Sequence, residues 1–80
     1  MGARRRLQWL CRRGTRELDM LLTGYLEHGY DASPPAVQRA FEQLLEWPDP
    51  ELYACLIGRR DTGDPALDEV VARIRDIAGH

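Results

Sequence analysis

Apolar residues recur along this chain at intervals of three and four, the spacing that places side chains on one face of an α-helix. Two of these apolar stripes are Leu18, Leu21, Leu22, Tyr25, Leu26 and Val37, Ala40, Phe41, Leu44, Leu45. Three further stripes are Leu7, Leu10, Cys11, then Leu52, Cys55, Leu56, and finally Leu67, Val70, Val71, Ile74, Ile77. Convincing strand alternation is absent, so the pattern predicts five amphipathic helices.

Glycine and a hydroxyl residue set the boundary between the first two helices. The first is expected over about 3–13, and Gly14 interrupts it, since glycine at a helix end adopts positive φ without a Cβ clash. Thr15 is placed to cap the second helix, which runs to about His28. Because this boundary depends on one glycine, a single kinked helix is the alternative.

A capping residue followed by proline marks the start of each later helix. Ser33, Asp49 and Asp64 each precede a proline, and a proline in the first turn is harmless because that N–H has no helical acceptor. The third helix is expected to end at Pro48 and the fourth at Gly58, followed by a polar loop over 59–63.

Length limits what these helices can build. Eighty residues form one domain, residues 1–80, which we predict to be a compact all-α bundle of about five short helices. A domain this small buries only about 60% of the surface of its unfolded chain and has little room for an internal active site. Apolar content of 44% with 30% charged residues is typical of a globular protein and argues against disorder.

Charge is unevenly distributed. The net charge is −2, but six of the 11 arginines lie in residues 1–16, where there is no acid. The basic end raises nucleic-acid binding as an alternative function. Against it, the body is acidic, Glu17 and Asp19 would repel phosphates, and no helix-turn-helix recognition helix is evident. We therefore expect no nucleic-acid partner.

The sequence lacks the features that mark several other classes of protein. No apolar run is long enough to span a membrane, and the start has no apolar core of a secretory signal, so we expect a cytoplasmic protein without membrane insertion.

Cys11 and Cys55 are isolated and expected to be reduced, half-buried thiols. His28 and His80 have no converging ligands, so no metal is expected. No nucleophile has a neighbouring base, and no dinucleotide fingerprint is present, so neither catalysis nor a bound cofactor is expected.

The most informative segment is the charged run Arg12–Asp19, which stands on the shoulder of the second helix. One interpretation is a solvated face with an i, i+4 pair of Arg13 and Glu17, worth only a few tenths of a kcal/mol. The other is a binding surface, in which Gly14 lets a partner backbone approach closely and the flanking charges pair with it.

Arg13-Gly14-Thr15-Arg16-Glu17 followed by Leu18-Asp19 and a leucine-rich helix resembles the signature of the SdhE-type FAD assembly factors, the succinate dehydrogenase assembly factor 2 family. The similarity extends from Trp9 to Gly58. Two positions depart from the family pattern: Thr15 replaces a residue that is often methionine, and Cys55 one that is often tryptophan. Trp47 lies nearby in the sequence and is a candidate to offset the second change.

The resemblance implies a non-enzymatic assembly factor. Members bind the flavoprotein subunit of succinate dehydrogenase, and in bacteria also fumarate reductase, and promote covalent attachment of FAD to a histidine of that subunit. The chemistry is attributed to the client, so FAD is not a cofactor of the factor itself. An antitoxin-like regulator that binds another protein is the alternative.

The resemblance also implies a partner-binding site, and we expect the protein to act as a monomer. Arg13 and Glu17 would contact the client, Gly14 would be the point of close approach, and Arg12, Arg16 and Asp19 would form the rim. Glu46 and Asp49 are secondary candidates, although helix capping is the preferred role of Asp49. The aromatic residues are expected mostly at the rim of the core: Trp9, Tyr25, Tyr30, Trp47 and Tyr53.

Overall fold

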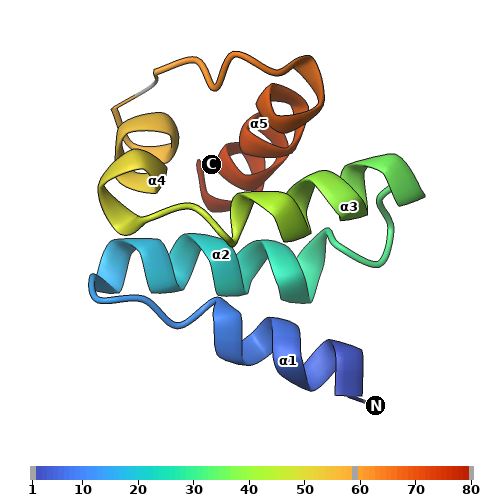
Figure 1. The fold of residues 1–80 in the computed structure, drawn as a ribbon. Helices are drawn as coiled ribbons and strands as arrows, with labels where there is room; N and C mark the ends of the chain where they lie inside the picture. Colours follow the sequence, from blue (N-terminus) through green and yellow to red (C-terminus); the bar gives the residue numbers. More distant parts are fainter. Residues whose placement is uncertain (1, 59, 80) are drawn as a thin grey trace.

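The computed structural model describes residues 2–58 and 60–79, and these form helices without any strand. The five helices are α1 (Gly2–Leu10), α2 (Arg16–His28), α3 (Pro35–Leu44), α4 (Asp49–Leu56) and α5 (Pro65–Gly79). The predicted all-α bundle is therefore confirmed (Figure 1). Arg59 of the predicted polar loop and the terminal His80 lie outside the described residues. None of the described helices has the length and apolar character needed to cross a membrane.

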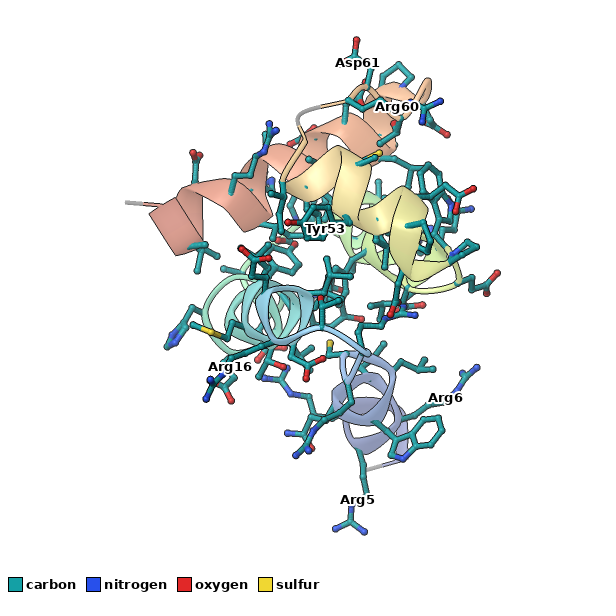
Figure 2. The ribbon with its side chains drawn as sticks, turned by 90° about the vertical axis from the view of Figure 1, so that its left-hand side faces the viewer. Arg5, Arg6, Arg16, Tyr53, Arg60 and Asp61 are labelled. Atoms are coloured by element: carbon teal, nitrogen blue, oxygen red, sulfur yellow. The ribbon has the colours of Figure 1, made fainter. Side chains whose placement is uncertain are left out.

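Helix α2 runs through the middle of the bundle. Helix α5 packs against α2 and α3, and α4 contacts α2 and α5. Helix α1 lies along the opposite side of α2, as Figures 1 and 2 both show from directions a quarter turn apart. The segment between α1 and α2 therefore lies at an edge of the molecule, close to where α4 begins.

The predicted apolar stripes form one continuous core. Its fully shielded side chains come from four helices and the segment after α1: Leu18, Leu22, Tyr25, Leu26, Phe41, Leu44, Leu52, Val70, Ile74 and Cys11. Leu21 is only partly buried and Ile77 is exposed, so one member of each of these two stripes reaches the surface. Both cysteines are free and more deeply buried than expected, and burial raises the pKa of Cys11 to about 11.

Tyr25 corrects the expectation that the aromatic residues mostly border the core, because its side chain is 0% exposed. Its hydroxyl lies 2.6 Å from Ser33 Oγ, and Ser33 donates to the Gly29 carbonyl at 2.7 Å. The Ser33 hydroxyl has only one proton and donates it to the Gly29 carbonyl. The Tyr25 hydroxyl must therefore be the donor in its bond with Ser33. A satisfied hydroxyl removes the main cost of burying a tyrosine completely.

Two of the predicted caps are wrong. Pro34 holds the cap position of α3 and Pro48 that of α4, and neither helix has a side-chain cap. Ser33 instead bonds within the preceding turn, and Asp49 accepts from the Gly14 N–H. The other two follow the prediction. Thr15 Oγ1 accepts from the N–H of Leu18 at 3.2 Å, and Asp64 Oδ1 accepts from the N–H of Ala66 at 2.9 Å.

The first two helices are separate, so the kinked alternative is wrong. Helix α1 ends at Leu10, earlier than predicted, and residues 11–15 form a linker. Gly14 does not use the positive φ expected of it; among the described glycines only Gly63 does, at φ 88°. In the linker the N–H of Arg13 donates to the Asp19 carboxylate rather than to a helical carbonyl.

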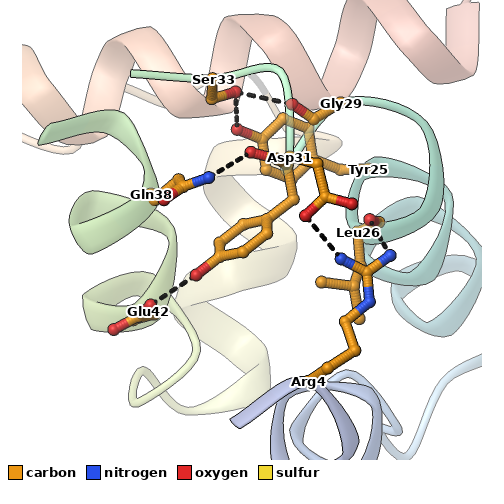
Figure 3. A network of polar contacts seen from close by, with 9 residues as sticks. Arg4, Tyr25, Leu26, Gly29, Asp31, Ser33, Gln38 and Glu42 are labelled. Atoms are coloured by element: carbon orange, nitrogen blue, oxygen red, sulfur yellow. Dashed lines mark hydrogen bonds and ion pairs between the residues drawn. The ribbon is translucent and has the colours of Figure 1, made fainter. Parts of the chain in front are cut away.

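Helix α1 is fastened to the turn between α2 and α3 by Arg4 (Figure 3). Its guanidinium donates to Asp31 Oδ1 at 2.9 Å and to the Leu26 carbonyl at 3.0 Å, near the end of α2. The same turn is held on its other side by Tyr30, which donates to Glu42 at 2.6 Å. Burial, together with this bond to a carboxylate, raises the pKa of Tyr30 to about 12.

Candidate partner-binding site

Two carboxylates hold the backbone of the linker between α1 and α2. The N–H of Arg13 donates to Asp19 in the first turn of α2, and the N–H of Gly14 donates to Asp49 Oδ2 at 3.1 Å. Asp49 is the first residue of α4. Both acids therefore lie at helix N-termini, where the helix dipole favours negative charge. The linker is fixed at the first two residues of the family signature, Arg13 and Gly14.

The side chain of Arg13 points into the molecule and is 15% exposed. Its guanidinium donates to the carbonyls of Leu45 and Trp47, just after the end of α3, and lies 3.5 Å from Asp49. Carbonyls at a helix C-terminus lack helical partners and favour a cation. Arg13 therefore ties α3 to α4. It does not form the ion pair with Glu17 that the spacing suggested.

Gly14 is exposed, and the space above it is open. A Cβ added here would meet only one heavy atom within 4 Å, Asp49 Oδ2 at 3.4 Å, which is an ordinary contact. The surface at Gly14 thus has the flatness expected of a close-approach point. That a partner uses it remains a prediction.

Glu17 lies on the exposed side of α2 beside Tyr53 of α4. Hydrogen bonding to the Glu17 carboxylate raises the pKa of the Tyr53 phenol. The Tyr53 side chain is 40% exposed, and Figure 2 shows it between α4 and the start of α2. The sequence did not single out Tyr53 as a companion of Glu17, because the two are far apart in the chain and only packing brings them together.

The remaining predicted residues divide between surface and interior. Arg12 and Arg16 are exposed, as is the secondary candidate Glu46. Asp19 is half-buried and is used in holding the linker. Trp9 of α1 is 75% exposed and lines a surface hollow with Arg5 and Arg12. Figure 2 shows Arg5 and Arg6 projecting outward from α1.

A surface hollow of about 530 Å³ adjoins the signature on the side of α5. We call it the α2–α5 groove; its walls include Glu17, Met20 and Leu21 of α2, Ile57 after α4, and Arg75 and Ala78 of α5. Glu17 therefore belongs both to the signature and to this groove. Sequence reasoning missed the groove because its walls come from three separate segments.

The structure shows the surroundings of Thr15 and Cys55, the two residues that depart from the family pattern. Thr15 supplies the side-chain cap of α2, which a methionine at that position could not do. Cys55 is buried and lines a hollow of about 160 Å³ together with Trp47. The two residues are thus neighbours in space, as the sequence hypothesis required.

Comparison with known proteins identifies the family of this chain. A family model described as the flavinator of succinate dehydrogenase matches residues 5–78. The FAD assembly factor SdhE of Methylococcus capsulatus is 40% identical over 79 residues, covering 99% of this chain and 95% of the relative. That of Colwellia psychrerythraea is 41% identical over 69 residues, and that of Pectobacterium atrosepticum 37% over 70. These two alignments cover 86% and 88% of this chain and 76% and 80% of the relatives. A family model that matches residues 5–78, together with relatives of about 40% identity over most of the chain, means that the chain belongs to the family of FAD assembly factors for succinate dehydrogenase.

Proposed function

We propose that this protein binds the flavoprotein subunit of succinate dehydrogenase and promotes the covalent attachment of FAD to it. One observation carries the proposal within a chain of this family. Gly14 is open to a partner, and the linker around it is fixed because Asp49 accepts from the N–H of Gly14 and Asp19 accepts from the N–H of Arg13. Glu17 stands beside it with an exposed carboxylate.

A rigid surface of this kind acts by favouring one conformer of its client. Because the linker is already ordered, little conformational entropy is lost when a partner docks on it. A protein that binds one conformer better than another shifts the client toward that conformer. The client would then spend more time in the arrangement from which it attaches its own flavin.

The proposal assigns the flavinylation chemistry to the client and FAD, not to this chain. Thiolates are the reactive form of cysteine, and burial raises the pKa of both Cys11 and Cys55. Two inert thiols support a binding role. On this proposal FAD belongs to the flavoprotein, and the assembly factor holds no flavin of its own.

The test is a reconstitution with the purified flavoprotein subunit lacking flavin. The subunit is incubated with FAD, with and without this protein, and covalent flavin is measured as fluorescence of the denatured band. We expect the wild type to raise the yield and Gly14→Glu to abolish the increase while the far-UV circular dichroism stays helical.

Gly24→Glu is the matched control, because a Cβ at Gly24 also has open space but lies in the middle of α2. It should stimulate as the wild type does. A Gly14→Glu protein that still raises the flavin yield normally would refute the site, and a wild type that raises nothing would refute the function.

A further inference from the structure

We propose that the α2–α5 groove is a second contact with the same client and takes a segment in which a bulky aliphatic side chain adjoins a lysine or arginine. This inference rests on the proposed function, since the client is the flavoprotein subunit. Beyond that function, it specifies which kind of client segment binds in the groove.

The floor of the groove is suited to an aliphatic side chain. Met20 is 67% exposed at its edge, and Leu21 and Ile57, which pack against the core, are only partly buried. A concave apolar surface of this kind gains free energy when it is covered. The flexible thioether of Met20 can adjust to the shape of what binds.

The charges at the groove favour a basic residue in the bound segment and favour one orientation of that segment. Glu17 lies at one wall of the groove and forms no ion pair within residues 2–58 and 60–79. The Tyr53 hydroxyl bonds to this carboxylate but is neutral, so the negative charge of Glu17 is still available to a cation from outside. Arg75 lies on the α5 wall, held in place by donation from Nε to the Leu56 carbonyl at 3.2 Å. A cation is attracted by Glu17 and repelled by Arg75, which favours one orientation of the bound segment.

Glu17 also connects the groove to the signature. The same carboxylate lines the groove and stands within the Arg13–Glu17 run, next to the open surface at Gly14. A client that contacts Gly14 is thereby positioned to place a neighbouring segment along α5. This continuity favours the client over a second copy of the chain as the occupant.

The first experiment fills the groove and measures affinity for the flavin-free flavoprotein subunit. Ala78→Phe places a ring in the groove, while Ala72→Phe adds the same ring to another exposed position of α5 outside it. We expect Ala78→Phe to weaken binding by about tenfold or more and Ala72→Phe to change it by less than about twofold. Equal affinity of the two variants would overturn the inference.

The second experiment leaves the fold untouched. Photo-methionine replaces methionine throughout the chain, which puts an activatable group at Met20 in the groove. After irradiation of the complex, mass spectrometry should find Met20 joined to a client segment that has a lysine or arginine beside a large aliphatic residue. Attachment only to a second copy of the chain, or to a segment without that pair, would overturn the proposal.

The two proposals fail in different ways. If the wild type does not raise covalent flavin in the reconstitution, the proposed function is wrong. If it does, but Ala78→Phe binds the client as Ala72→Phe does, the function stands and only the groove assignment is wrong.

Discussion

The guanidinium of Arg13 lies 3.5 Å from the carboxylate of Asp49, and this ion pair joins the linker after α1 to the start of α4. The same carboxylate accepts from the N–H of Gly14. Asp49 therefore fixes both the side chain of one signature residue and the backbone of the next. The shape of the surface at Gly14 depends on an acid that lies far away in the sequence.

Removing that acid should loosen the linker. Asp49→Ala leaves a mostly buried guanidinium without its counter-ion and an amide without its acceptor, so we expect a loss of about 1–3 kcal/mol in the free energy of unfolding. Asp49→Asn keeps an acceptor oxygen and should lose less. Urea unfolding followed by circular dichroism measures both.

Asp61→Ala is the control for this series, because Asp61 is exposed and should contribute little. If Asp49→Ala unfolds at the same urea concentration as Asp61→Ala, the ion pair and the amide bond do not hold the linker.

Glu17→Ala should separate binding from stability. The Glu17 side chain is exposed, so its loss should change the free energy of unfolding by less than about 0.5 kcal/mol. Affinity for the flavin-free flavoprotein subunit should nevertheless fall, and titration calorimetry can measure it. Glu27→Ala, an exposed acid on the same helix, should keep the affinity of the wild type. A large drop in melting temperature for Glu17→Ala would instead assign Glu17 a structural role.

Asp68 should make stability depend on acid pH. Its carboxylate accepts from the hydroxyl of Thr62 at 2.7 Å and from the N–H of Thr62 at 2.9 Å, and these bonds lower its pKa from 3.8. Because the folded state favours the ionised acid, the stabilisation is present above pH 3.8 and is lost as the pH falls through the lower folded pKa.

Asp68→Asn removes this titration, since an amide does not ionise in that range. We expect its urea midpoint to be lower than that of the wild type at neutral pH, with the difference shrinking toward about pH 2. The result to look for is convergence of the two curves on acidification; parallel curves would exclude the linkage.

Ser33 should be needed to keep Tyr25 buried. In Ser33→Ala the buried Tyr25 hydroxyl has no acceptor, which should cost about 1–3 kcal/mol of unfolding free energy. Tyr25→Phe removes the hydroxyl itself, so the double variant should be more stable than the sum of the single effects predicts. A simple sum would show that the hydroxyls of Tyr25 and Ser33 act independently.

The sequence predicted the helices and the site unequally well. Helical periodicity identified every helix, because an apolar stripe and a proline in the first turn are local features. For the signature, exposure at Arg12, Gly14, Arg16 and Glu17 agrees with a surface role. The inward position of Arg13 was not predictable, because its acceptors lie after α3 and its counter-ion begins α4.

The sequence by itself determined which segments become helices, which of their faces are buried, and to which family the signature points. The first two follow from spacing within a dozen residues, where the geometry of one helix sets the distances, and the third rests on the resemblance of residues 13–19 to a known signature. Only the tertiary structure decided the partners of Asp49 and Ser33, the pairing of Glu17 with Tyr53, and the groove between α2 and α5. Those depend on how separate helices pack, and polar side chains at helix ends bond whichever group the packing brings within reach.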